Sequence, residues 1–184
     1  LCTINGKRPG KTILMDGHID TVDVIDALQW KHDPFGGEIV DGRIYGRGTS
    51  DMKGSDCAMI TAAARYAEKT GKDFAGKICV SCTVHEECFE GVSSREITRL
   101  AKPDFVIIGE ATTTTVKRGQ RGRAEVVVET EGVSCHSSNP EKGVNAVYEM
   151  MAVIEEIRKI VPNEHPLLGK GILELTDIIS KPYP

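Results

Sequence analysis

The sequence is poor in the features that mark secreted, fibrous and membrane proteins. Its 184 residues contain six cysteines, too few and too irregularly spaced for a disulfide framework, which favours reduced thiols and a cytoplasmic location. Apolar runs such as residues 106–108 are far shorter than the roughly 20 residues that span a bilayer, so we expect no membrane partner. The 19 glycines and eight prolines follow no period, which excludes a collagen-like or low-complexity chain.

Positive charge is also scarce. The chain has 23 Lys and Arg against 27 Asp and Glu, a net charge of -4, and no basic cluster. Nucleic acid is therefore not an expected partner, because phosphate binding needs a clustered basic surface. A 40% share of hydrophobic residues and a 27% share of charged residues are typical of an ordinary globular chain.

Hydrophobic periodicity predicts alternating strands and helices in residues 1–117. We expect strands at 12–16, 77–84 and 104–108, helices at 53–69 and 93–100, and a hairpin turn at Asp41-Gly42. The face of the first helix that packs on the sheet would be formed by Ala58, Ala62, Ala63 and Tyr66. The pattern predicts an α/β fold with a mostly parallel sheet and flanking helices.

The character of the sequence changes at Arg118. Residues 125–131 alternate apolar and acidic side chains like an antiparallel strand, residues 142–160 have a helical period, and residues 171–180 read as another strand. Asn139-Pro140 would mark the start of that helix. We therefore expect a second, α+β domain at 118–184. Three elements would leave apolar faces uncovered, so we expect both domains to be incomplete and the sequence to lack both ends.

Cys79 and Cys82 form a C-x-x-C pair, a spacing that can bind metal or form a redox disulfide. The surrounding alternation is that of a strand, which would place the two thiols on opposite faces of the sheet. A shared metal ion or disulfide is therefore not expected.

Acidic residues and one histidine lie next to the ends of the predicted elements. They are His18, Asp20, Asp51, Glu86, Glu87 and Glu110. Each alone is more often a helix cap, a polar loop residue or a solvated turn. Because the carboxyl ends of parallel strands meet in one crevice, their shared position favours a common site. One imidazole with several carboxylates suits zinc, cobalt or manganese.

Five segments follow one another along the chain: MDGHIDTV (15–22), GRGTSDMKG (46–54), HEE (85–87), GEAT (109–112) and GVSCHSS (132–138). Together they resemble the co-catalytic zinc amidohydrolases, the family of acetylornithine deacetylase, succinyl-diaminopimelate desuccinylase, aminoacylase and glutamate carboxypeptidase. The segment RGQRGR (118–123), taken with the last of the five segments, is most similar to the YgeY-like branch. The resemblance covers nearly the whole chain.

This resemblance implies a role for each candidate residue. His18 and Glu110 would bind one of two divalent metal ions, Asp51 would bridge both, Glu87 would bind the other, Asp20 would orient His18, and Glu86 would be the general base. The ions would be zinc, with cobalt or manganese as alternatives.

The resemblance also implies that residues 118–184 form a lid and dimerisation domain and that the protein is a homodimer. His136 would enter the partner subunit's active site and stabilise the oxyanion. The family's last metal-binding histidine would follow the lid, beyond Pro184, and the first helix and strand would precede Leu1. His165 is no substitute, since it reads as a surface loop residue inside the lid.

We therefore expect a hydrolase of amide C–N bonds in N-acyl amino acids or small peptides, with Glu86 taking a proton from a metal-activated water. Two alternatives remain open. One is a dipeptidase or aminopeptidase of the same clan, and the other is a non-catalytic binding module of the same fold. A chain that lacks one metal ligand is expected to be inactive by itself.

Overall fold

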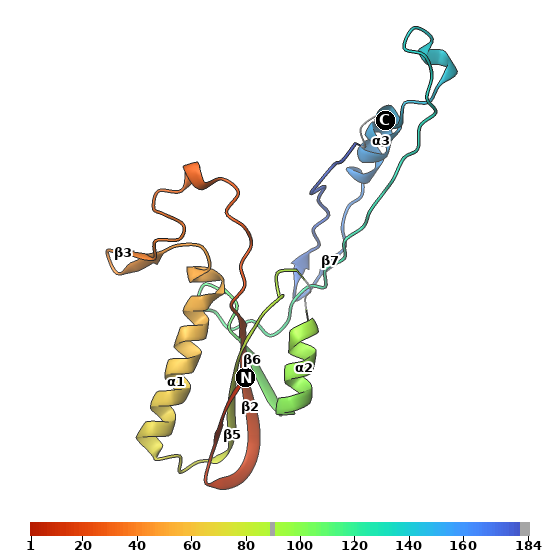
Figure 1. Ribbon diagram of the computed structural model, residues 1–184. Coiled ribbons are helices and arrows are strands. Elements are labelled where there is room, and N and C mark those ends of the chain that lie inside the picture. Colours follow the sequence, from red (N-terminus) through yellow and green to blue (C-terminus); the bar gives the residue numbers. More distant parts are fainter. Residues whose placement is uncertain (89–90, 181–184) are drawn as a thin grey trace. The chain divides into compact units, whose positions relative to one another are not determined.

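Figure 1 shows the computed structural model of the chain, which describes residues 1–88 and 91–180. The chain divides into two compact units, Leu1–Thr115 and Val116–Pro184. None of the helices in the described part of the chain has the length and apolar character needed to span a bilayer.

A four-stranded sheet with the order β1-β5-β2-β6 forms the centre of the first unit. Its strands are β1 (Cys2–Asn5), β2 (Arg8–His18), β5 (Ala75–Thr83) and β6 (Phe105–Ile108). Strand β2 runs parallel to β5 and β6, and β1 is antiparallel to β5. The predicted mostly parallel sheet is confirmed, and the carboxyl ends of three strands therefore meet at one edge.

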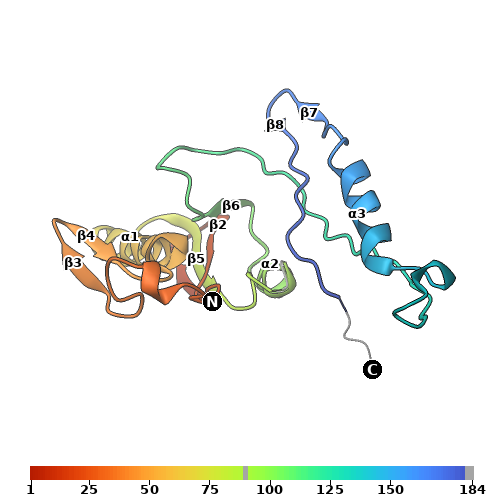
Figure 2. The ribbon, with the colours of Figure 1, turned by 90° about the horizontal axis from the view of Figure 1, so that it is seen from above.

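Two helices cover opposite faces of this sheet, as Figure 2 shows from above. They are α1 (Gly54–Thr70) and α2 (Val92–Ala101). Met15 and Val80 pack with Met52, Met59 and Ala63 on the α1 side. The adjacent Leu14 and Cys79 pack with Ala101 on the α2 side. Alternate residues of β2 and β5 thus serve two separate apolar clusters, as strand geometry requires.

The packed face of α1 differs from the predicted one. Its buried residues are Asp56, Met59, Ala63 and Ala67, whereas Ala58 and Ala62 are exposed and Tyr66 is 47% exposed. Only Ala63 of the predicted set is buried. The prediction weighted small side chains, but turning Met59 toward the sheet removes more apolar surface from water than an alanine would.

The prediction for the C-x-x-C pair is confirmed, because the two thiols lie on opposite faces. Cys79 belongs to the cluster on the α2 side. Cys82 is the cross-strand partner of Gly17, and its thiol neighbours the carboxyl group of Asp56 in α1. All six cysteines are unpaired.

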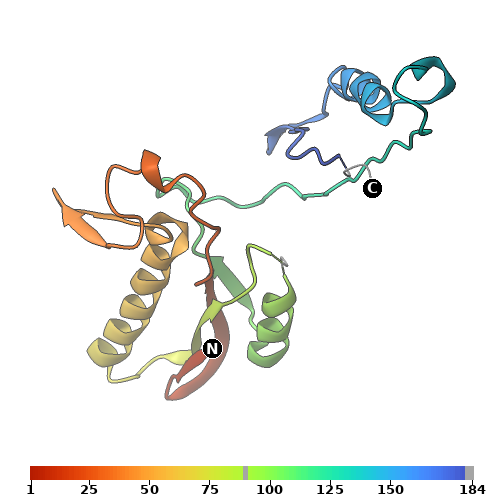
Figure 3. The ribbon, with the colours of Figure 1, turned by 45° about the horizontal axis from the view of Figure 1, so that its top comes forward.

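A hairpin joins β3 (Glu38–Val40) to β4 (Arg43–Tyr45), as predicted. Its turn residues Asp41 and Gly42 have φ angles of 50° and 75°, the left-handed region that two-residue hairpin turns use. A 3-10 turn at Ala27–Gln29 precedes the hairpin, and a π-helical turn at Thr49–Lys53 leads from it into α1. The hairpin lies near the N-terminal end of α1 (Figure 3).

Among the described residues of the second unit, the one α-helix is α3 (Ala146–Ile157), where a helix was predicted. Its N-cap is Asn145, whose side chain accepts a hydrogen bond from the Val147 N–H at 3.0 Å. The predicted cap Asn139 instead precedes a separate 3-10 turn, Pro140–Lys142. The helix start was placed wrongly because Gly143, which has an extended conformation, separates the two elements.

The larger antiparallel sheet predicted for the second unit is absent from the described residues. The strands there are β7 (Glu164–His165) and β8 (Gly169–Lys170), together with one bridge between Val133 and Val144. Residues 125–131 and 171–180 carry no strand. Alternation shows which side chains could share a face, but a strand also needs a backbone partner, and the pattern does not specify one.

Candidate metal centre

His18 is the last residue of β2, and it is only 1% exposed. Its Nδ1 lies 2.9 Å from the backbone oxygen of Asp20 and 3.6 Å from the carboxylate of the same residue. A carbonyl can only accept, so this contact makes Nδ1 the protonated nitrogen. The lone pair of Nε2 is then available for a metal ion.

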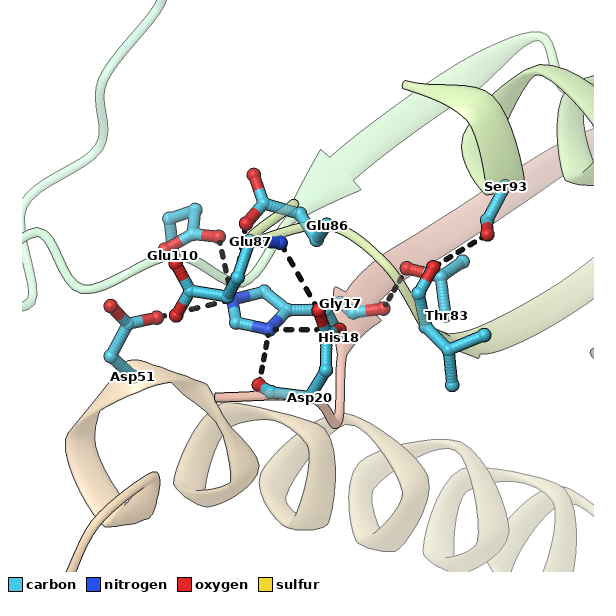
Figure 4. Close-up of polar contacts among 10 residues, drawn as sticks. Gly17, His18, Asp20, Asp51, Thr83, Glu86, Glu87, Ser93 and Glu110 are labelled. Carbon is cyan, nitrogen blue, oxygen red and sulfur yellow. Dashed lines mark hydrogen bonds and ion pairs between the residues drawn. The ribbon is translucent and has the colours of Figure 1, made fainter. Parts of the chain in front are cut away.

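Three carboxylates surround Nε2 of His18, as Figure 4 shows. Asp51 Oδ1 lies at 3.1 Å, Glu110 Oε1 at 3.4 Å and Glu86 Oε2 at 3.8 Å. Glu87 joins a group with His18 and Asp51 whose possible ligand atoms all lie within 4.8 Å of one another. His18, Glu86 and Glu110 form a second such group. The structure therefore brings five of the six candidate residues to one place.

The electrostatics of this cluster suit a cation. Burial raises the pKa of Glu110, and the negative charge of Asp51 raises it further. Burial lowers the pKa of His18, but the Asp20 carbonyl and the charges of Glu110 and Glu86 outweigh it, so the net pKa is raised. A divalent ion would relieve the repulsion among the carboxylates, and the set of oxygens with one imidazole nitrogen fits such an ion.

Asp20 connects the histidine to the acidic pair. Its Oδ2 accepts a hydrogen bond from the backbone N–H of Glu87 at 3.1 Å. Burial alone would raise the pKa of Asp20, but backbone N–H groups of Glu87 and Glu86 stabilise the charged form and lower it overall. An ionised Asp20 therefore faces the protonated Nδ1 of His18, the arrangement that fixes a ligating imidazole.

Two glycines allow α1 to approach these strand ends closely. Gly17 precedes His18, and a Cβ there would overlap the Asp56 carboxylate and lie 2.5 Å from Met52 Cε. Gly109 precedes Glu110, and its Cβ would lie 2.9 Å from the terminal methyls of Met52 and Met59. The absence of side chains at both positions lets the first turns of α1 lie against the sheet, which brings Asp51 within reach of His18.

Sequence reasoning did not identify Asp16 and Asp56. Asp16 lies within β2 and accepts hydrogen bonds from the hydroxyls of Ser81 and Ser94. Asp56 is 3% exposed, and burial raises its pKa. Each is an acid in an otherwise apolar strand or packing stripe, and this interruption is the signal that could have revealed them.

The predicted lid residue His136 lies in the second unit. It is exposed, and its Nδ1 is 2.8 Å from the hydroxyl of Ser138. Its action in an active site stays a prediction. His165 is also exposed and ends β7, and its Nδ1 accepts from the backbone N–H groups of Leu167 and Leu168 at 3.2 Å, so it supports the turn that follows the strand.

Known proteins are similar to this chain in sequence and in fold. A family model described as peptidase family M20/M25/M40 matches residues 14–170. The uncharacterized protein YgeY of Escherichia coli K12 is 36% identical over 172 residues, which cover 91% of this chain and 42% of YgeY. Succinyl-diaminopimelate desuccinylase 2 of Ruegeria sp. TM1040 is 34% identical over 158 residues, which cover 80% of this chain and 40% of the desuccinylase.

A solved structure shows the same fold. It is the M20 family metallo-carboxypeptidase Sso-CP2 from Sulfolobus solfataricus, with a TM-score of 0.62 at 24% sequence identity, covering 85% of this chain and 37% of that one. The chain spans less than half the length of these relatives.

Proposed function

The chain belongs to peptidase family M20/M25/M40, and from this premise we propose that the full-length protein is a metal-dependent hydrolase of amide C–N bonds. One observation carries the proposal. The Nε2 atom of buried His18 and the carboxylates of Asp51, Glu86 and Glu110 converge at the carboxyl edge of the sheet. This edge is where ligands bind in open α/β sheets.

The site would hold two divalent ions, zinc in the first place and cobalt or manganese as alternatives. His18 and Glu110 would bind one ion, Asp51 would bridge both, and Glu87 would bind the other. A carboxylate has two oxygens and can join ions roughly 3.5–4 Å apart. Support comes from the grouping of Glu87 with His18 and Asp51, and from the 60% exposure of the Asp51 side chain, which leaves it open to an entering ion.

The proposed reaction uses Glu86 as general base. When bound, the ions would supply Lewis acidity and make a coordinated water easier to deprotonate. Glu86 is 38% exposed and lies beside the cluster, so its carboxylate can take a proton from the attacking water. It would then return that proton to the departing amine. Asp20 would keep His18 and the segment of Glu87 in place while Glu86 acts.

The substrate class would be N-acyl amino acids or small peptides. Support comes from relatives named as a succinyl-diaminopimelate desuccinylase and a metallo-carboxypeptidase, proteins whose names describe cleavage of C–N bonds. Both an N-acyl amino acid and a small peptide contain an amide carbonyl and release an amine, and the residues of the candidate centre could act on either.

We further propose that the second unit is a lid and dimerisation domain of a homodimer, and that His136 stabilises the oxyanion in the partner's site. Val147 and Met151 lie four residues apart on α3 and are 50% and 55% exposed, an apolar stripe that suits a subunit contact. Six unpaired cysteines support a cytoplasmic location.

The test uses the full-length protein. Metal content is measured by elemental analysis, and hydrolysis of a panel of N-acyl amino acids and dipeptides is measured with and without a chelator. We expect about two ions per subunit and activity that chelation removes and metal restores. A protein that binds metal but cleaves no amide in the panel would instead be a binding module of the same fold.

A further inference from the structure

Asp16 joins the two elements that flank the loop of Glu86 and Glu87. It lies on β2, two residues before His18. Its Oδ1 accepts from the hydroxyl of Ser81, its cross-strand neighbour on β5. Its Oδ2 accepts from the hydroxyl of Ser94, in the first turn of α2, at 3.2 Å. One carboxylate thus binds both the strand before the loop and the helix after it.

Other contacts show that this loop depends on outside support. Ser93 donates to the carbonyl of Val84 at 2.6 Å, which links the first turn of α2 to the residue that follows β5 (Figure 4). Nearer the tip of the loop, the Glu87 N–H binds Asp20. His85 has a φ angle of 62°, in the left-handed region that non-glycine residues rarely adopt. The neighbouring contacts therefore help to hold a backbone conformation that is uncommon for a non-glycine residue.

The carboxylate of Asp16 is chemically suited to hold Ser81 and Ser94 together. A carboxylate accepts several hydrogen bonds and donates none, so it can receive two hydroxyls at once. Bonds to a charged acceptor are stronger than bonds between neutral groups. Ser81 is 0% exposed, so its hydroxyl needs a partner inside the protein.

We infer that Asp16 is a positioning residue, which fixes the Glu86 carboxylate relative to His18 by holding the loop through Ser81 and Ser94. Asp16 itself touches no reacting atom. The effect on catalysis rests on the proposed role of Glu86, whereas the effect on the loop does not.

The first experiment measures the loop directly, by hydrogen exchange of residues 84–88 in the full-length protein. Ser94→Ala should speed exchange there by about tenfold to a hundredfold, the scale of one lost hydrogen bond to a charged group. Ser94→Thr keeps a hydroxyl and should restore slow exchange. Thr98→Ala is the matched control, because that hydroxyl lies on the same helix and donates to the Ser94 carbonyl at 2.7 Å.

The second experiment is a double-mutant cycle on kcat. Ser94→Ala should lower kcat by about tenfold while KM and metal content stay unchanged, because Glu87 keeps its separate hydrogen bond to Asp20 and the substitution shifts only the Glu86 carboxylate. In a Glu86→Gln background, Ser94→Ala should lower kcat hardly any further, because the carboxylate that the Ser94 bond positions is already gone. Asp16→Ala removes the hydrogen bonds to both Ser81 and Ser94, and it should lower kcat by more than Ser94→Ala does.

Unchanged exchange of residues 84–88 in both Ser94→Ala and Asp16→Ala would overturn the inference. A loosened loop with full kcat, or a loss that adds fully to that of Glu86→Gln, would overturn the positioning role. If the wild-type protein hydrolyses no amide, the proposed function fails, and the exchange result alone then decides whether Asp16 anchors the loop.

Discussion

The carboxylate of Asp20 binds the backbone N–H of Glu87 at 3.1 Å, although the two residues lie 67 positions apart in the chain. The other oxygen of the same carboxylate is 3.6 Å from Nδ1 of His18. A residue that follows β2 therefore sets the position of a residue that follows β5. The histidine and the acidic pair are consequently held as one unit, and the predictions about the centre depend on this coupling.

The neighbouring acids Glu86 and Glu87 should differ in what they lose on substitution. In the full-length protein, Glu86→Gln should keep its metal but lose about 10²–10⁴ of kcat, the usual contribution of a general base. Glu87→Gln should lose metal, because an amide is a weaker ligand than a carboxylate. Elemental analysis and steady-state kinetics on both variants check this, and identical metal content with identical activity would refute the two roles.

His136→Ala should leave metal binding and dimerisation intact and lower kcat by about 10²–10³, the scale of one lost oxyanion donor. The sharper measurement uses a dimer of one His136→Ala subunit and one Glu86→Gln subunit. If His136 acts in the partner's site, one site carries both defects and the other neither, so about half of the wild-type activity should return. Mixed dimers that form but stay inactive would show that His136 does not act across the interface.

Gly17→Ala should destabilise the protein by about 1–3 kcal/mol, the usual cost of overpacking, because the new methyl group would overlap the Asp56 carboxylate. Chemical denaturation measures the change. Gly122→Ala is the matched control, since a Cβ at that position has no other atom within 4 Å. Equal stability of the two variants would mean that α1 does not need its close approach to β2.

The stability contributed by Asp104 should depend on pH. The Lys11 ammonium donates to Asp104 Oδ1 at 2.7 Å, the Thr12 N–H donates to Oδ2 at 2.8 Å, and both lower the pKa of this carboxyl. A lowered pKa in the folded state stabilises the protein above the unfolded pKa of about 3.9, and this stabilisation is lost as pH falls through the folded value.

Asp104→Asn should therefore lower the urea midpoint at pH 7, and the difference from wild type should shrink at pH 3. Glu68→Gln, on the exposed face of α1, serves as the control. If the difference in urea midpoint between Asp104→Asn and wild type stays constant from pH 7 to pH 3, the charge of Asp104 is not the cause of that difference.

The sequence predicted the first unit well because its signals are local and redundant. Apolar runs marked β2, β5 and β6, and the turn chemistry of Asp41-Gly42 marked the hairpin. Parallel strands then force their ends to one edge, so His18 and Glu110 could be brought together from topology alone.

The remaining features depend on contacts that no local pattern encodes. The two hydrogen bonds of Asp16 require knowing that Ser94 starts a helix beside β2. The side chains of Met52 and Met59 lie close to Gly17 and Gly109, and the pattern within α1 does not show that the strand ends leave this space. In the second unit, the alternation of residues 125–131 indicated a strand but specified no partner for its backbone.

The glycines before His18 and Glu110 also set limits for protein engineering. Because Gly17 and Gly109 both lie against the first turns of α1, the segments that carry His18 and Glu110 cannot be grafted into another scaffold without the helix that packs on them. A mutant library that screens the proposed hydrolase on other substrates should therefore leave the residues of β2, β6 and α1 unchanged. The exposed loop around Ile25 and Leu28, which follows Asp20 in the chain, can vary without disturbing that packing.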